Sequence, residues 1–345
     1  MLRKVLNNVA SNIVGSELNR KHLAVTLYNV QALFNSAISR NQNSFDPFEM
    51  GRRTVFRNVE KCREHYRANA FYGISQCLKD YSGYRDKICA CIEHGVYFGS
   101  YVNPREALDS GLPAVITFGS MRKRHLEKVS PLQIVPIGPY IQYAKEYYSI
   151  DEEIKIKEKL GKTLLVFPQH SCLEALAGYD KNYFFEQVET IRQRDNFDSV
   201  IVNVYYRDLN HSLIEVCDSR GYVVSCAGHQ TDPLFLPRLK SIIRLADYTV
   251  SAAVGTHVGY CVYLNKPHAI LGDFKILPKG IDASYSEERQ RDFDRLEDAF
   301  KERGGGITRR QIELCNYYWG NDINYSKREM NSMLTECEMR FMKTK

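Results

Sequence analysis

The sequence predicts an α/β protein in which parallel sheets carry helices on both faces. Apolar, β-branched runs at 161–167, 199–206 and 221–228 are typical of buried strands, and helical spacing separates them. The segment 235–246 has apolar residues on one face of a helix. Strands that alternate with helices favour the doubly wound arrangement. At 345 residues the chain exceeds the usual size of a single core, so we expect two domains.

The segment 247–271 carries the most informative local pattern. A short β-branched run ends in small residues and Gly255-Thr256, an apolar helical turn follows, and Lys266-Pro267 precedes another apolar run. This order predicts strand, tight loop, helix and strand. Small residues let backbone amides approach a ligand, and a helix N-terminus favours an anion such as a nucleotide phosphate. An ordinary strand-loop-helix turn fits the same residues.

Polar or small residues follow three of the predicted strands. His170 comes after the first strand, Gly228 after the third, and Gly255 after the run at 247–251. In parallel sheets, ligands bind beyond the carboxyl ends of the strands. We therefore expect these three loops to meet at one edge of a sheet.

The run from about 160 to 271 resembles the donor-binding half of a GT-B glycosyltransferase. The likeness is to bacterial CMP-sugar-dependent sialyl- and Kdo-transferases and to CDP-glycerol glycerophosphotransferases. His170-Ser171 stands where those enzymes have a His-Pro motif, and Ser251 with Gly255-Thr256-His257 stands at their Ser/Thr-rich loop. Tyr260 occupies the place of a ribose-binding Glu. The resemblance implies donor contacts from Gly138, His170, Ser171, Gly228, Ser251, Gly255, Thr256 and His257.

The N-terminal half carries a matching pattern. An apolar run from Lys87 ends in Glu93-His94-Gly95 and resembles the Trp-His-Gly loop of the glycerophosphotransferases. The resemblance implies that His94 is the general base, and an imidazole suits that task because its ordinary pKa of about 6.5 lies near working pH. His94 could instead bond its own turn, His257 could point into helix packing, and Ser251 or Thr256 could cap a helix.

We expect four segments along the chain. A basic helical segment at 1–75 belongs with an acceptor domain at 76–150, a nucleotide-sugar-binding domain covers 151–285, and helices at 286–345 pack back on the N-terminal domain. The expected terminal helices are 286–303, 307–319 and 326–343.

Charge and cysteine usage suggest a place in the cell. Residues 1–67 hold 11 Lys/Arg and 5 Asp/Glu, which accounts for the whole net charge of +6. Such a basic amphipathic start could lie on anionic lipid, or the helix could simply pack on the first domain. Ten cysteines without disulfide spacing favour a reducing cytoplasm, and neither a signal peptide nor a transmembrane stretch is expected.

Together these patterns predict a glycosyltransferase that acts on a cell-surface polysaccharide or lipid-linked acceptor. The donor would carry a cytidine nucleotide, and no metal or other cofactor is expected because no metal-ligand spacing occurs. The alternatives are a polyol-phosphate transferase and a non-catalytic nucleotide- or glycan-binding protein. A nucleic-acid partner is disfavoured, because the chain beyond residue 67 has no excess of positive charge.

Overall fold

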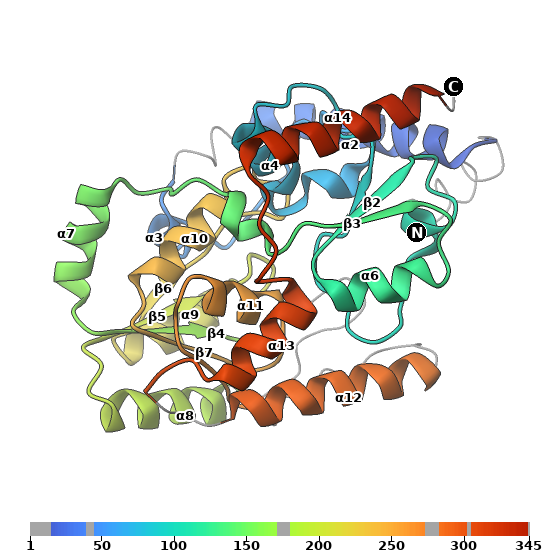
Figure 1. The fold of residues 1–345 in the computed structure, drawn as a ribbon. Coiled ribbons are helices and arrows are strands. Elements are labelled where there is room, and N and C mark those ends of the chain that lie inside the picture. Colours follow the sequence, from blue (N-terminus) through green and yellow to red (C-terminus); the bar gives the residue numbers. More distant parts are fainter. Residues whose placement is uncertain (1–14, 39–44, 171–179, 273–282, 302–304, 344–345) are drawn as a thin grey trace.

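The computed structural model describes residues 15–38, 45–170, 180–272, 283–301 and 305–343. It contains two sheets, and every pair of neighbouring strands in them is parallel (Figure 1). The predicted fold class, an α/β protein with two parallel sheets and helical end segments, is confirmed.

The smaller sheet belongs to the N-terminal part of the chain. Its order is β1-β2-β3, with β1 at Cys91–Ile92, β2 at Ala114–Thr117 and β3 at Gln133–Pro136. The elements around it are α2 (Glu17–Ile38), α3 (Pro47–Met50), η2 (Arg67–Gly73), α4 (Ile74–Ser82), α5 (Pro104–Ala107), α6 (Ser120–Glu127) and η3 (Tyr140–Tyr143). All four residues of β2 are buried, as a central strand covered on both faces requires.

The larger sheet has the order β6-β5-β4-β7-β8. Its strands are β4 (Thr163–Phe167), β5 (Ser199–Asn203), β6 (Val223–Ser225), β7 (Tyr248–Ser251) and β8 (His268–Ile270), and its helices are α7 (Ile150–Leu160), α8 (Lys181–Arg194), α9 (His211–Ser219), α10 (Phe235–Leu245) and α11 (Thr256–Tyr263). The chain runs outward from β4 to β6 and then returns to the other side of β4. The strand order therefore reverses between β4 and β7, where ligands bind in such sheets.

Three helices end the chain, α12 (Ala283–Phe300), α13 (Arg309–Trp319) and α14 (Lys327–Lys343). Both ends of α12 lie three residues before the predicted ones. The ends of α13 and α14 lie within two residues of the predicted ends. Helix α13 packs on α6 and α11, and α14 packs on α4, so the end of the chain joins both halves of the molecule (Figure 1).

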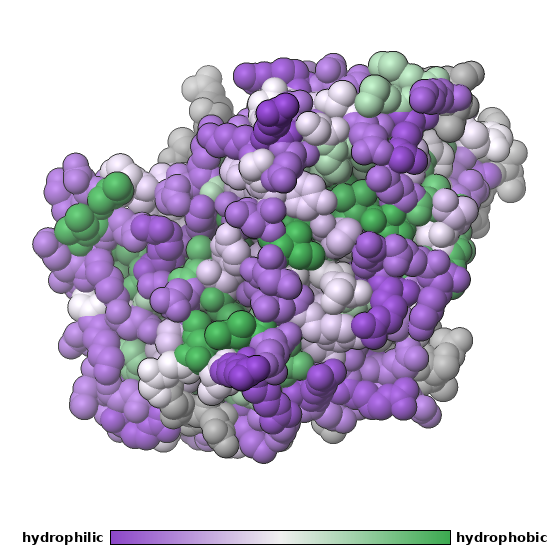
Figure 2. Space-filling model, in the orientation of Figure 1, coloured by the Kyte–Doolittle hydropathy of each residue, from purple (hydrophilic) through white to green (hydrophobic). Residues whose placement is uncertain are grey.

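One buried apolar cluster includes Ile116 of β2, Leu165 of β4 and Trp319 of α13. The two sheets therefore share a core, while a second cluster around Phe184 and Val202 covers the other face of the larger sheet. The face seen in Figure 2 is mostly hydrophilic, with an apolar patch on α7, where Ile150 and Ile154 are exposed.

Candidate functional site

The carboxyl-terminal edges of the two sheets meet where the sequence predicted a site. Val96, four residues after β1, donates its backbone N–H to Thr256 Oγ1 at 3.2 Å. Thr256 is the first residue of α11, which follows the end of β7. A second contact is a hydrogen bond between two backbone groups, in which the N–H of Tyr72 donates to the carbonyl of Gln230, in the loop after β6, at 2.6 Å. The edges are therefore in direct contact, and the loop of His94 lies against the helix N-terminus predicted to bind phosphate.

Aromatic side chains surround His94. Its ring centroid lies 5.3 Å from that of Phe71, 6.1 Å from that of Tyr72 and 6.0 Å from that of Tyr97. Burial lowers the pKa of His94 to about 4, and the neighbouring Glu93 carboxylate partly opposes this effect. Nδ1 has no hydrogen-bond partner. The imidazole is therefore neutral at physiological pH and keeps one ring nitrogen for a proton donor or acceptor.

A buried ion pair fixes the residue that precedes His94. Arg122 of α6 bonds both carboxylate oxygens of Glu93, with Nη2–Oε1 at 2.6 Å and Nε–Oε2 at 3.0 Å. Thr117, at the end of β2, donates its hydroxyl to Glu93 Oε2 at 2.6 Å. Tyr140 donates to the backbone carbonyl of Glu93 at 2.8 Å. Because the end of β2, α6 and η3 all hold Glu93, the direction in which His94 leaves the strand is set by three elements.

His257 and His170 lie at the carboxyl-terminal edge of the larger sheet. The ring of His257 stacks on Phe167 at the end of β4, with centroids 4.7 Å apart and planes 20° apart. Burial, reinforced by His170, lowers the pKa of His257 to about 3, and its Nε2 has no partner. His170 is exposed and lies 5.2 Å from the ring of Tyr205. Both histidines thus stand where β4 and β7 end.

Ser251, the last residue of β7, is buried below the loop that carries His257. Its hydroxyl is buried, donates to Ala253 O at 2.9 Å and lies 3.0 Å from His268 Nε2. His268 Nδ1 in turn lies 2.7 Å from Thr249 Oγ1. Ser251 therefore supports the loop that leads to Gly255, which precedes α11 in an extended conformation.

The remaining predicted donor contacts are more scattered. Gly228 has φ +109°, and a Cβ there would lie 2.9 Å from Asp232 Oδ2 and 3.0 Å from Arg238 Nη1. Gly138 has φ +79° and faces the carbonyl of Ile323, which would be 2.6 Å from a Cβ. Both backbones adopt the left-handed region that favours glycine, and both positions are packed against protein groups. Ser171 lies outside the described residues.

Aromatic residues that the sequence patterns did not point to also lie at the site. A strand was expected over 199–206, but β5 ends at Asn203, so Tyr205, Tyr206 and Arg207 follow the strand end. The guanidinium carbon of Arg207 lies 5.3 Å from the centroid of the Tyr206 ring, and the hydroxyl of Tyr205 donates to Gln230 Oε1 at 3.4 Å. The same strand-end argument that selected His170 would have found this loop if the strand had been ended at Asn203, the first polar residue after the apolar run 200–202.

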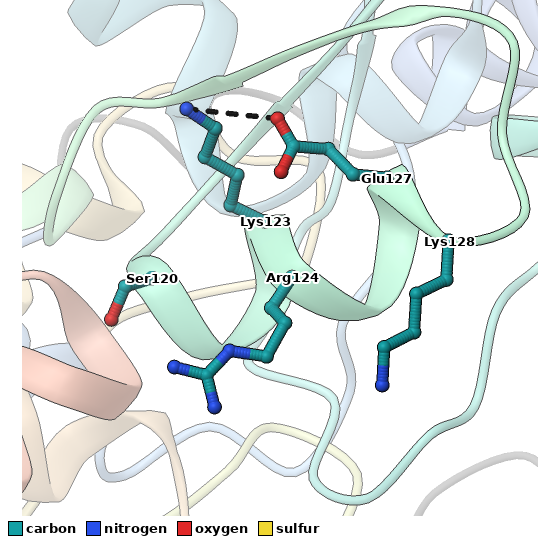
Figure 3. A pocket seen from close by; sticks show the side chains of 5 residues that line it. All are labelled: Ser120, Lys123, Arg124, Glu127 and Lys128. Carbon is teal, nitrogen blue, oxygen red and sulfur yellow. Dashed lines mark ion pairs between the residues drawn. The ribbon is translucent and has the colours of Figure 1, made fainter.

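A shallow recess on α6 lies apart from these residues. Ser120, Lys123, Arg124, Glu127 and Lys128 line it, and Lys123 pairs with Glu127 at 3.6 Å (Figure 3). All five come from α6 and the residue after it, so the recess is a solvated helix face with a basic character. Over the described ranges, no group of three or more His, Cys, Asp or Glu side chains is placed to hold a metal ion.

No helix in the part of the chain that the structure describes is long and apolar enough to cross a bilayer. Neither the protein-family models nor the curated proteins contain a match to this chain.

Solved structures give loose similarities. A UDP co-structure of S. aureus MnaA is 12% identical with a TM-score of 0.40, covering 79% of this chain and 80% of that one. E. coli ADP-heptose LPS heptosyltransferase II is 11% identical with a TM-score of 0.29, over 67% and 71%. The glycosyltransferase of kitacinnamycin is 11% identical with a TM-score of 0.28, over 66% of this chain and about half, 52%, of its own.

Proposed function

We propose that this chain is a glycosyltransferase that moves a sugar from a nucleotide-activated donor to a hydroxyl of a cell-surface polysaccharide or a lipid-linked acceptor. The observation that supports it is the contact between the His94 loop and the N-terminus of α11 through Val96 and Thr256, at 3.2 Å. This contact places a neutral imidazole beside a helix end that favours an anion. A group transfer from a phosphate ester can use the first to accept the proton of the attacking hydroxyl and the second to stabilise the leaving phosphate.

In the proposed reaction, the acceptor oxygen attacks the anomeric carbon while the bond from that carbon to the donor phosphate breaks. The acceptor proton passes to His94, and the nucleotide leaves with the electron pair of the broken bond. Because the pKa of His94 is lowered to about 4, the imidazole takes the proton only as the new bond forms. The backbone amides at the start of α11, with His257 and His170, would stabilise the leaving phosphate without a metal ion.

The cytidine nucleotide remains part of the proposal. It rests on the resemblance to the CMP-sugar enzymes, and the placement of His170 and of Gly255-Thr256-His257 at the ends of β4 and β7 supports a nucleotide phosphate there. A polyol-phosphate transferase would use the same edge, but the donor phosphate would then travel with the transferred group. Acceptor assays with the two donor classes separate these chemistries.

Binding and turnover of matched histidine variants test the proposal. Isothermal titration with CMP, UDP, GDP and ADP identifies the nucleotide, after which His94→Ala and His170→Ala are compared with the exposed control His211→Ala. We expect His94→Ala to keep nucleotide affinity and to lose about 10²–10⁴-fold in turnover. His170→Ala should weaken nucleotide binding by about 1.5–3 kcal/mol, the range for a hydrogen bond to a charged group. If no nucleotide binds, or if His94→Ala abolishes nucleotide binding, the proposal fails.

We also propose that the enzyme works at the inner face of a membrane, held there by its N-terminal segment. Between Lys21 and Ile38, α2 carries no charged residue, and Leu27, Leu33 and Phe34 are at least half exposed. The opposite side of α2 buries Tyr28 and Ala32, so the exposed stripe is additional to the packing of the helix. An amphipathic helix next to basic residues is suited to an anionic lipid surface.

Vesicle cosedimentation tests this placement. The protein should sediment with vesicles that contain anionic lipid and stay in solution with zwitterionic vesicles. Phe34→Ser should reduce binding several-fold, whereas Ser36→Ala, on the exposed side of the same helix, should leave it unchanged. Equal sedimentation of wild type and Phe34→Ser would contradict a role for α2.

A further inference from the structure

Two further loops reach the ligand-binding edge of the larger sheet. Asn203 and Ser225, the last residues of the neighbouring strands β5 and β6, are paired in register. Arg207 and His229 each follow the end of their strand by four residues. Because the two strands are parallel and in register, both residues lie at the carboxyl-terminal edge, where ligands bind in such sheets. Neither residue has a role in the reaction proposed above.

The ring of Tyr206 brings the two side chains together. The guanidinium carbon of Arg207 lies 5.3 Å from the centroid of this ring, and the centroid of the His229 ring lies 4.5 Å from the same point. A guanidinium over an aromatic face is attracted by the ring electrons. Burial lowers the pKa of His229 to about 4, and the positive charge of Arg207 adds to this effect. A cation and a neutral imidazole therefore lie next to each other on one aromatic side chain.

The hydrogen bonds of His229 decide which ring nitrogen carries its proton. The backbone N–H of Thr231 donates to His229 Nδ1 at 3.3 Å. Because a backbone N–H can only donate, Nδ1 carries a lone pair and the proton of the neutral ring is on Nε2. Nε2 forms no hydrogen bond with any described residue, and it is not among the fully buried atoms that lack one. His229 thus offers an accessible N–H donor, held by a bond within its own loop.

Arg207 is a cation without a partner of opposite charge. Its side chain is exposed, and it forms no ion pair with any residue in the part of the chain that the structure describes. Two other arginines of this half, Arg238 and Arg244, are paired with Asp232 and Glu153. A guanidinium beside an N–H donor is suited to the oxygens of a phosphate or a carboxylate. The two side chains therefore favour an anionic group.

This pair lies apart from the place proposed for the leaving phosphate. In the strand order, β5 and β4 separate β6 from β7, whose end leads to α11. With about 4.8 Å between neighbouring strands, the ends of β5 and β6 are about 10 and 14 Å from that of β7. Adjoining phosphates of one nucleotide share an oxygen atom and cannot span this distance. An anion at Arg207 and His229 is therefore a second charged group.

The His229 loop also reaches the residue proposed as the base. The backbone N–H of Tyr72 donates to the carbonyl of Gln230, which follows His229. The ring of Tyr72 lies 6.1 Å from that of His94. A substrate bound at the loop can therefore extend to His94, where the acceptor hydroxyl must lie.

We propose that Arg207 and His229 form an anion-binding subsite for the acceptor, which recognises a carboxylate or a phosphate group on the acceptor sugar. The inference rests on the proposed function, because it assigns the anion to a substrate of that reaction. Two sources share this chemistry, the carboxylate of an acidic sugar and the phosphate of a phosphorylated one.

Binding of small acids without nucleotide tests the subsite. Affinities for glucuronate, glucose 1-phosphate and neutral glucose are measured by titration calorimetry at low ionic strength, for the wild type, Arg207→Gln, Arg207→Lys and His229→Phe. The matched control is Arg220→Gln. Arg220 also lies over an aromatic ring, 5.8 Å from the centroid of Phe185, but it precedes β6 and so lies at the opposite edge of the sheet. CMP is titrated separately, and melting temperatures show that each variant is folded.

We expect the wild type to bind at least one of the two acids more tightly than glucose, and salt to weaken this binding. Arg207→Gln should lose about 10–100-fold in affinity for that acid, the effect of hydrogen bonds to a charged group. Arg207→Lys should recover part of the loss, since it restores the charge without the planar guanidinium. His229→Phe keeps a ring on Tyr206 but removes the N–H, and should lose about 10-fold.

The two acids distinguish the two sources. Binding of glucuronate alone assigns a carboxylate, and binding of glucose 1-phosphate alone assigns a phosphate. Arg220→Gln should bind both acids as the wild type does, because its edge of the sheet carries no part of the subsite.

Two results would overturn the subsite. One is that neither acid binds the wild type more tightly than glucose. The other is an affinity for the acids that Arg207→Gln leaves unchanged, and a loss of CMP affinity in that variant would then assign Arg207 to the donor. Failure of the proposed function is distinguishable, since it requires that no nucleotide bind the wild type, whereas the acid titrations contain no nucleotide.

Discussion

The two edges that meet at the site are stabilised in different ways. On the smaller sheet, a fully buried ion pair between Glu93 and Arg122 holds the residue before His94. On the larger sheet, uncharged groups perform the same task, with His268 bonded between Thr249 and Ser251 beneath the loop to α11. Both edges carry neutral histidines, but only His94 has a carboxylate in the adjacent position that raises its pKa.

The difference indicates a division of work. A buried ion pair resists displacement because either partner alone is a charge without compensation. It suits a base that must keep one direction relative to its substrate. An uncharged network adds no charge of its own, so the electrostatic potential there is set by the positive end of the α11 dipole. Such a potential suits a site for a leaving anion. The following predictions test this comparison, from the largest expected effect to the smallest.

The largest effect should come from the ion pair. Arg122→Met leaves the Glu93 carboxylate buried without its partner and should lower the free energy of unfolding by about 3–5 kcal/mol. The matched control is Arg309→Met, which breaks the exposed pair with Glu313 and should change stability by less than about 0.5 kcal/mol. Chemical denaturation measures both. Equal small effects would show that the pair does not hold the smaller edge.

A second prediction concerns acid. The pKa values of His94 and His229 are lowered to about 4 and that of His257 to about 3, and the pKa of His268 also lies well below its ordinary value, because all four are buried. Below about pH 6.5 the unfolded chain binds protons that the native state does not, so stability should fall as the pH drops from 7 to 4.5. Each histidine contributes about 1.4 kcal/mol per pH unit to that slope.

Urea unfolding at several pH values checks this slope. His268→Gln should reduce it by the share of one histidine, and so should His94→Gln, although the share of His94 ends near pH 4, where its native form takes up a proton. A slope that His268→Gln does not alter would mean that His268 titrates in the fold as it does in the unfolded chain.

The smallest effect should come from the bond between the edges. Thr256→Val removes the acceptor of the Val96 N–H and should cost about 1 kcal/mol of stability. Thr190→Val, on an exposed turn of α8, loses only a bond within its own helix and should cost less. Denaturation at one pH compares the two. If Thr256→Val is as mild as the control, the two edges do not depend on each other through this contact.

Much of the fold could be predicted because local patterns of apolar residues determine its helices and strands. The run before His170 became β4 and the spacing at 235–246 became α10, since apolar periodicity selects strand or helix without reference to the rest of the chain. The strand ends were less predictable. Tyr205 and Tyr206 continue the β-prone run beyond Asn203, but they lie outside the sheet, where Tyr206 packs against the distant rings of Phe56 and His229.

For the site, the sequence by itself determined which residues follow the strand ends, namely His94, His170 and the Gly255–His257 loop. Parallel strands bring their carboxyl ends to one edge, so this much needs no coordinates. Only the tertiary structure decided how these residues are used. Burial against distant residues keeps His94 and His257 neutral, and packing holds Ser251 and the two glycines against protein groups. Burial and hydrogen-bond pairing depend on residues far apart in the chain, and no local pattern records them.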